Sequence, residues 1–234
     1  MNSNDKICEV INKKGFTPKY VAEVGVWHPN ASNIYTYIMD GIETMLVEPD
    51  PKSIGLIKDK FNKPNVTLHA AAVCDFEGEI ELCQRGASTF VSHLPSSPAL
   101  VNDDCDIEKS ESFVAQAIKF SSIDNGKIDL ISIDIEGSEW FVIKNMRSRP
   151  AVISIETHGG MYINYYINEI MQWMRENNYS LLYKNRSDSV YVLTSVIEIT
   201  MLDKLNLMNQ ELYLSLNSIR KKIKERLKIL FFSN

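Results

Sequence analysis

The sequence predicts an α/β fold in which a mostly parallel sheet ends in an antiparallel hairpin. Short apolar segments alternate with segments of helical periodicity over residues 20–176, the order that parallel strands and crossover helices produce. The run at residues 128–133 is almost continuously apolar, as in a strand buried on both faces of a parallel sheet. Two last strand candidates, residues 179–183 and 190–193, are separated by a polar turn and predict the closing hairpin.

Length and composition agree with one globular domain. The 234 residues suffice for a single core, and 44% hydrophobic with 24% charged residues excludes disordered and fibrous classes. The apolar runs are too short to cross a bilayer and residues 1–15 are polar, so we expect a cytoplasmic protein. Four cysteines without a CxxC pair indicate neither a zinc site nor a disulfide framework.

The N-terminal half predicts a helix, then two strand–helix steps and two further strands. A leading helix ends at Gly15. Residues 20–26 form the first predicted strand, with helix-start residues at 29–32. Further strands are expected at residues 44–47, 66–73 and 79–82, and a helix at residues 54–61.

The C-terminal half repeats this alternation. Residues 86–112 are rich in Ser, Pro and Asp without a period, and we predict a long loop over the substrate site. Buried strands at 128–133 and 151–155 precede helices at 140–144 and 163–176. We place the domain at residues 1–197 and a C-terminal amphipathic basic helix at 198–234.

The C-terminal segment combines an apolar stripe with a basic end. Apolar residues recur every three or four positions from Leu205 to Leu230, which predicts one amphipathic helix. Residues 220–228 carry a net charge of +5, which leaves −10 for the rest. The acidic body argues against nucleic-acid binding. The helix either packs on the domain, forms a homo-oligomer or contacts the inner face of a membrane peripherally; packing or oligomerisation is favoured.

Two strand ends offer residues for a nucleoside-containing cofactor. Glu23 and Gly25 end the first predicted strand, where glycine permits close backbone approach and an acid can pair with a cation or hydroxyl. Glu48 ends the second strand about 20 residues later. A carboxylate at that position can accept both ribose hydroxyls.

Later strand ends offer candidates for catalysis. Asp134 follows the most buried strand, and Glu156 and His158 follow its neighbour. Asp134 or His158 could act as a general base. Alternatively, Asp134, Glu156 and His158 could bind magnesium or manganese. The sequence does not separate a base from a metal ligand.

Four motifs resemble FkbM-type methyltransferases. They are Glu-Val-Gly at 23–25, Val-Glu-Pro-Asp at 47–50, Ala-Ala-Val at 71–73 with Gly-Glu at 78–79, and the run IDLISIDIEGSE at 128–139, with similarity continuing at 150–156. The resemblance covers about residues 20–195, and the segment 134–139 is its most specific part. Trp and Pro at positions 27 and 29 depart from the Asn and Gly usual in this family.

The resemblance implies a Rossmann-like class I methyltransferase fold with a seven-stranded sheet and S-adenosylmethionine as cofactor. It places Glu23 and Gly25 by the methionine moiety, Glu48 by the ribose, and Ala72 to Asp75 near adenine. It also implies methylation of a hydroxyl, often on sugars or polyketides. Lys, Asn and Ile usage of bacterial type favours a sugar, nucleotide-sugar or surface-glycan precursor as acceptor.

Two other classes share part of this pattern. An NAD-dependent oxidoreductase has the same strand, glycine loop and ribose acid, but it expects GxGxxG and only one glycine is present here. A non-catalytic nucleotide-binding protein would use the strand-end carboxylates only structurally. Binding of S-adenosylmethionine, of NAD or of neither distinguishes the three.

Overall fold

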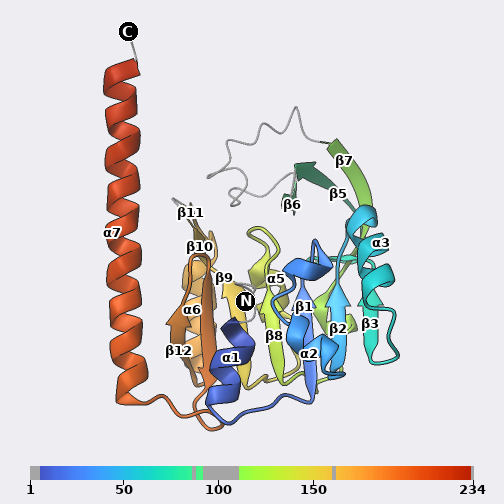
Figure 1. The fold of residues 1–234 in the computed structure, drawn as a ribbon. Helices are drawn as coiled ribbons and strands as arrows, with labels where there is room; N and C mark the ends of the chain where they lie inside the picture. Colours follow the sequence, from blue (N-terminus) through green and yellow to red (C-terminus); the bar gives the residue numbers. More distant parts are fainter. Residues whose placement is uncertain (1–5, 86–87, 92–110, 160–161, 233–234) are drawn as a thin grey trace.

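The computed structural model describes residues 6–85, 88–91, 111–159 and 162–232. Its central feature is a seven-stranded sheet with the order β12-β13-β9-β8-β1-β2-β3 (Figure 1). The strands are β1 (Tyr20–Val24), β2 (Glu43–Val47), β3 (Val66–His69), β8 (Leu130–Ile133), β9 (Val152–Glu156), β12 (Tyr179–Lys184) and β13 (Asp188–Leu193). Only β13 runs against its neighbours. This arrangement confirms the predicted class I methyltransferase fold, including the antiparallel C-terminal strands.

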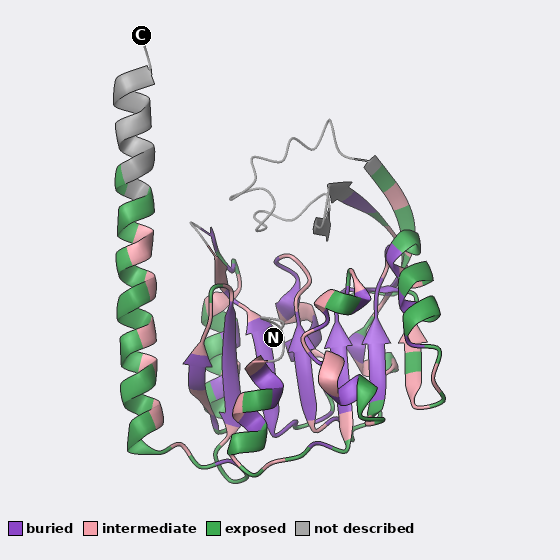
Figure 2. Ribbon diagram, viewed as in Figure 1, coloured by how far each residue is buried: buried purple, intermediate pink, exposed green. Residues whose placement is uncertain are grey.

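Helices cover both faces of this sheet. One apolar cluster contains side chains of α1 (Lys6–Lys13), α2 (Tyr35–Met39) and α3 (Pro51–Lys60). The other contains side chains of α5 (Glu139–Lys144) and α6 (Ile167–Glu176). Successive strand residues face opposite sides, so Val21 joins the first cluster and Ala22 the second. Figure 2 shows the resulting buried central strands.

The strand order reverses at β1, which determines where a ligand can bind. β1 pairs in parallel with β2 on one side and with β8 on the other. The chain segments that leave β1 and β8 therefore diverge toward opposite faces and open a crevice at the carboxyl ends of these strands.

A second sheet was missed by the sequence prediction. Its order is β4-β7-β5-β6, formed by β4 (Ala72–Val73), β5 (Gly78–Arg85), β6 (Ser88–Val91) and β7 (Glu111–Ile118). The predicted loop at 86–112 is therefore wrong at both ends, where β6 and the start of β7 lie; residues 92–110 fall outside the described residues. A small cluster of Cys74, Leu82 and Ala117 packs under this sheet.

Several predicted boundaries shift. β1 ends at Val24 because Gly25 turns the chain with a φ of +85°. The predicted strand at 66–73 is divided between β3 and β4, which belong to different sheets. The expected helix at 163–176 begins only at Ile167, after the short strands β10 (His158–Gly159) and β11 (Tyr162–Ile163). Two 3-10 turns, η2 (Pro29–Ala31) and η4 (Phe120–Ser122), complete the described elements.

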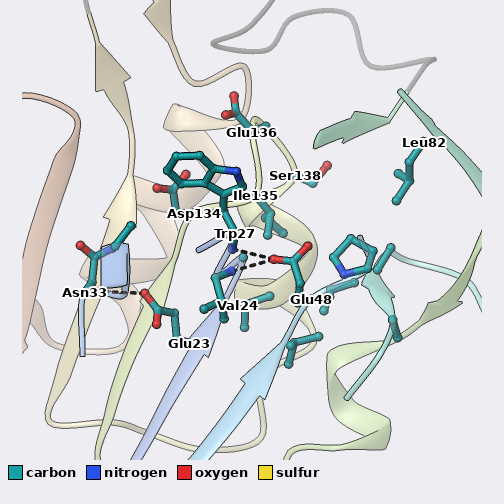
Figure 3. Close-up of a pocket in the computed structure, with 18 residues that line it drawn as sticks. Glu23, Val24, Trp27, Asn33, Glu48, Leu82, Asp134, Ile135, Glu136 and Ser138 are labelled. Atoms are coloured by element: carbon teal, nitrogen blue, oxygen red, sulfur yellow. Dashed lines mark hydrogen bonds between the residues drawn. The ribbon is translucent and has the colours of Figure 1, made fainter. Parts of the chain in front are cut away.

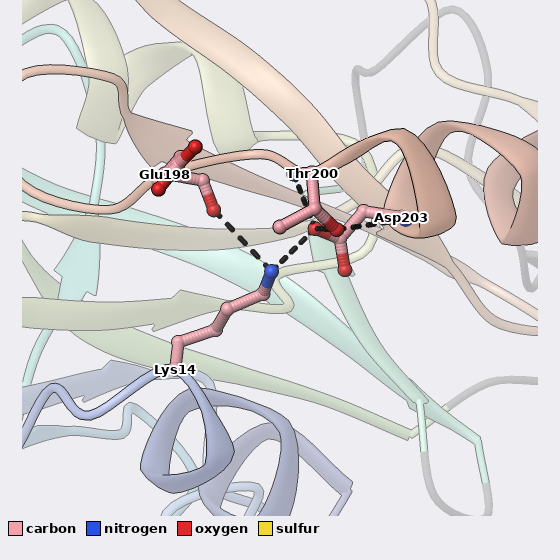
Figure 4. Close-up of polar contacts among 4 residues, drawn as sticks. All are labelled: Lys14, Glu198, Thr200 and Asp203. Atoms are coloured by element: carbon pink, nitrogen blue, oxygen red, sulfur yellow. Dashed lines mark hydrogen bonds and ion pairs between the residues drawn. The ribbon is translucent and has the colours of Figure 1, made fainter.

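The C-terminal segment forms one helix, α7 (Met201–Phe232), as predicted. It runs beside the β12 edge and extends past the sheet (Figure 1). Its start is fixed to the domain: Lys14 forms an ion pair with Asp203 and donates to the Glu198 carbonyl at 3.3 Å, while the Thr200 amide and hydroxyl both donate to Asp203 at 2.6 Å (Figure 4). In the described parts of the chain, no helix has the length and apolar character needed to cross a membrane.

Candidate functional site

A pocket opens at the carboxyl ends of β1, β2 and β8, where the strand order reverses (Figure 3). Its lining brings together four of the residues predicted to bind the cofactor and one predicted to act in catalysis: Glu23, Gly25, Glu48, Ala72 and Asp134. Two predicted residues of the catalytic and metal sets, Glu156 and His158, do not belong to this lining, and neither does Asp75.

Glu48 organises the loop that follows β1. Its Oε2 accepts the amide protons of Val26 at 3.0 Å and Trp27 at 2.8 Å, and its Oε1 accepts that of Asp50 at 3.0 Å. Burial raises the pKa of Glu48, whereas these three amides stabilise the charged form. Trp27 adopts a φ of +51°, an uncommon conformation for a large residue, and its side chain lines the pocket.

Gly25 is required by the neighbouring strand. A Cβ at this position would lie 1.8 Å from the backbone oxygen of Asp134. The loop after β1 therefore crosses directly over the end of β8. The sequence prediction explained this glycine by close approach of a ligand, whereas here the closest atoms belong to the protein backbone.

Glu23 is a buried carboxylate at the floor of the pocket. The Ser32 hydroxyl donates to its Oε2 at 2.5 Å, and the Asn33 amide donates to its Oε1 at 2.8 Å. Burial raises the pKa of Glu23 to about 7. Asn33, which the sequence analysis did not identify, also lines the pocket and donates to Ser132 at 3.1 Å, so it links the start of α2 to β8.

Glu139 organises the loop that follows β8 in the same manner. Its Oε1 accepts the amide protons of Ile135 at 3.1 Å and Gly137 at 3.0 Å, and Asn164 donates to Oε2. Burial raises the pKa of Glu139 to about 7. The loop it holds supplies Asp134, Ile135 and Ser138 to the pocket. In the sequence, Glu139 stands only at the end of the 128–139 motif and has no predicted role. Sequence alone does not show that its side chain turns back toward the preceding amides.

Asp134 and Glu156, both half-buried, form a carboxyl pair. Desolvation raises the pKa of each, and nearby carboxylates, Asp188 among them, raise both further. A hydrogen bond from Glu156 stabilises the charged form of Asp134. Two neighbouring carboxyl groups in such surroundings share one proton. The pair therefore titrates as one unit, and Asp134 is the member of it that lines the pocket.

His158 points toward the hairpin. Its Nε2 lies 3.1 Å from the Asn185 carbonyl and therefore donates to it, which leaves Nδ1, 2.9 Å from the Thr157 hydroxyl, as an acceptor. Burial lowers the pKa of His158, so the ring is neutral. Both ring nitrogens are thus engaged by protein groups, and the structure offers no support for His158 as the base.

The predicted metal set is not assembled. Among the residues that the structure describes, no three His, Cys, Asp or Glu side chains are grouped so that they could hold a metal ion. Asp134 and Glu156 contact each other, but His158 turns away to Asn185. Asp75, predicted near adenine, is exposed and pairs with Lys144 at 3.4 Å.

The sequence matches the family model described as the methyltransferase FkbM domain over residues 19–181. This match spans well over half of the chain. The chain belongs to the FkbM methyltransferase family. As an FkbM-family protein, it is an S-adenosylmethionine-dependent methyltransferase. No curated protein sequence matches it significantly.

Solved structures similar to this FkbM-family chain are distant. The methyltransferase domain of bacterial CtHen1 is 8% identical with a TM-score of 0.45, and the match covers 81% of this chain and 97% of that chain. A putative RNA methyltransferase from Pyrococcus horikoshii is 7% identical with a TM-score of 0.46 and 82% coverage of both chains. A ribosomal protein L11 methylase from Lactobacillus delbrueckii subsp. bulgaricus is 13% identical with a TM-score of 0.40, covering 82% of this chain and 79% of that chain.

The pocket of this FkbM-family chain has the charge that the cofactor requires. Its described lining holds four acids, Glu23, Glu48, Asp134 and Glu136, and no Lys, Arg or His. S-adenosylmethionine carries a sulfonium and an ammonium against one carboxylate, so its net charge is positive. A carboxylate-lined crevice at the strand-order reversal therefore fits this cofactor.

Proposed function

We propose that this chain methylates a hydroxyl oxygen of a sugar, nucleotide-sugar or surface-glycan precursor. The observation that supports this acceptor class is that Trp27 and Asp134 line the same pocket. The Trp27 side chain is 47% exposed although its backbone is held by Glu48. A fixed, solvent-facing indole offers a flat apolar surface to the C–H groups of a sugar ring, and the adjacent carboxylate accepts a hydroxyl proton.

The chemistry requires alignment and removal of one proton. S-adenosylmethionine, when bound, supplies an electrophilic methyl group with a neutral thioether as leaving group. The pocket would align the acceptor hydroxyl with that methyl group, and the Asp134 carboxylate would take the hydroxyl proton. The raised pKa of this carboxyl makes it a stronger base than an exposed aspartate.

The loop after β1 disfavours the oxidoreductase alternative. In a dinucleotide-binding fold, backbone amides of this loop bind the pyrophosphate. Here the amides of Val26 and Trp27 already donate to Glu48. A pyrophosphate would have to replace a buried carboxylate and approach further acids without a described basic residue in the lining.

A screen of sugar nucleotides and free glycans tests the acceptor. We expect a mass increase of one methyl group on a sugar, only with S-adenosylmethionine present, in reactions with and without magnesium. A Trp27→Ala variant should raise KM for the sugar while leaving the cofactor Kd nearly unchanged. Methylation of a nucleobase, a peptide or an amine instead of a sugar hydroxyl would overturn the proposal.

A further inference from the structure

Helix α7 has two opposite faces that differ in character. With about 100° between successive residues, the half-buried positions that face the domain lie together: Asp203, Leu207, Gln210, Leu214, Asn217 and Ser218. Specific contacts on this side are polar: Gln210 accepts the Lys184 amide at 2.9 Å, and Glu211 pairs with the Lys184 ammonium at 3.0 Å. The helix is therefore held to the β12 edge largely through its polar residues.

The other face carries a continuous apolar seam. It consists of seven large side chains that are each 48–71% exposed: Met201, Leu205, Met208, Leu212, Leu216, Ile219 and Ile223. These positions fall within an arc of about 80° on the side opposite to the domain. Their spacing averages about 3.7 residues, so the seam runs nearly parallel to the helix axis. The seam leaves seven large apolar side chains in solvent, and such a surface marks an interaction site.

Charge indicates which partner covers the seam. The described residues that border the seam include Lys204 and Arg220 but no free acid, since the nearest carboxylate, Glu211, is paired with Lys184. Residues 220–228 add a net charge of +5 in a chain of net charge −5. In a parallel pair of α7 helices, the basic residues of one copy would lie against those of the other. In an antiparallel pair, the basic residues would find no acidic residues beside the seam of the partner helix with which to form ion pairs.

We propose that α7 is an interfacial membrane helix that lays its apolar seam into an anionic lipid surface. An apolar stripe bordered by Lys and Arg is the pattern of helices that lie in the membrane plane, and basic residues are attracted to anionic headgroups. The helix lies on the surface because it is not apolar enough to cross it. The domain is attached to the opposite side of α7 (Figure 1), so it faces the aqueous phase with its pocket accessible.

Co-sedimentation with vesicles tests this proposal on the full chain. We expect binding to vesicles of phosphatidylcholine mixed with phosphatidylglycerol, and much weaker binding to phosphatidylcholine alone. Leu212→Glu should reduce binding about tenfold or more, because a buried Leu contributes roughly 1.5–3 kcal/mol. The matched control is Asn206→Glu, which adds the same charge at an exposed position outside the seam, and it should change binding less than about threefold.

A second pair of substitutions tests the electrostatic part. Lys204→Gln with Arg220→Gln should weaken binding to the anionic vesicles about 25-fold, at roughly fivefold per charge, and added salt should weaken wild-type binding. Circular dichroism and S-adenosylmethionine affinity establish that each variant is folded. Equal sedimentation of wild-type and Leu212→Glu protein would overturn the proposal, and so would a lipid-free dimer that Leu212→Glu dissociates while wild-type protein ignores the vesicles.

Discussion

Glu23 illustrates, at the scale of one residue, a conflict between stability and binding. Its carboxylate is buried with hydrogen bonds from Ser32 and Asn33. In Glu23→Gln the amide oxygen can still accept from Asn33, and the amide NH2 can donate to Ser32, whose hydroxyl also accepts. We therefore expect unchanged or higher stability in urea denaturation at neutral pH. S-adenosylmethionine affinity measured by calorimetry should fall about tenfold, because a charged partner is lost.

The pH dependence of Glu23 has a defined sign. Burial raises its pKa from 4.5 to about 7, so between these pH values the folded chain holds a proton that the unfolded chain releases. Its contribution to the free energy of unfolding therefore falls as pH rises through this window, by a few kcal/mol at about 1.4 kcal/mol per pKa unit. Glu139 shifts in the same direction, so Glu23→Gln should flatten the slope partly. An identical slope in the variant would contradict this assignment.

Asp134 is expected to act in the reaction itself. Asp134→Asn removes the proton acceptor at the pocket while an amide of similar size remains in place. We expect turnover to fall at least about 100-fold, the usual contribution of a general base, with the S-adenosylmethionine Kd changed less than about threefold. Rapid-quench turnover and calorimetry on the same preparation provide the two readouts. A fully active variant would remove Asp134 from the mechanism.

The sequence identified strand-end carboxylates but not the orientation of their side chains. Glu23, Glu48 and Asp134 were found because buried strands end at them, and they line one pocket. His158 follows a strand in the same way, yet its ring is bound by Asn185 and Thr157. Position along a strand determines which edge of the sheet a residue occupies. It does not determine which hydrogen-bond partner the side chain finds there.

The contact between the loop after β1 and the end of β8 depends on Gly25. Gly25→Ala would place a Cβ 1.8 Å from the Asp134 backbone oxygen at a φ of +85°. Gly41→Ala is the matched control, because its φ is +83° and no atom lies within 4 Å of the added Cβ. We expect the control to lose about 1–2 kcal/mol of unfolding free energy in urea and Gly25→Ala to lose distinctly more. Equal losses would show that backbone conformation alone explains this glycine.

The elements themselves were predicted where periodicity was strong. The buried strands β8 and β9 and the amphipathic α7 were each recognised. β7 was missed because half of its alternating positions are small: Ala115 and Ala117 face the core between polar or exposed residues. Alanine contributes little to an apolar pattern and also favours helices. The second sheet therefore became visible only through its pairing with β5.

For the whole molecule, charge is separated between the pocket and the helix. The described lining of the pocket is acidic, whereas the basic residues at 220–228 lie in the far part of α7. This separation allows one chain to attract a cationic cofactor at one place and an anionic surface at another. The two interactions are expected to be independent, because α7 contributes no described residue to the pocket.

The acidic pocket also predicts ligand choice for the molecule as a whole. A ligand that binds only the folded state at about 100 times its Kd adds roughly 2.7 kcal/mol of stability, which corresponds to a rise in Tm of about 5–10 °C for a chain of this size. We expect that rise with S-adenosylmethionine and none with NAD, because the pyrophosphate would meet Glu48 where it needs the amides of Val26 and Trp27.

The preference for S-adenosylmethionine over S-adenosylhomocysteine should depend on pH. S-adenosylhomocysteine lacks the sulfonium charge, so we expect it to bind more weakly than S-adenosylmethionine, and this difference in affinity should be larger at pH 8 than at pH 6. At pH 6 Glu23, with a pKa of about 7, is largely neutral and no longer favours the charged ligand. Differential scanning fluorimetry measures the Tm with each of the three ligands separately at both pH values. Stabilisation by NAD would contradict the assignment of the pocket.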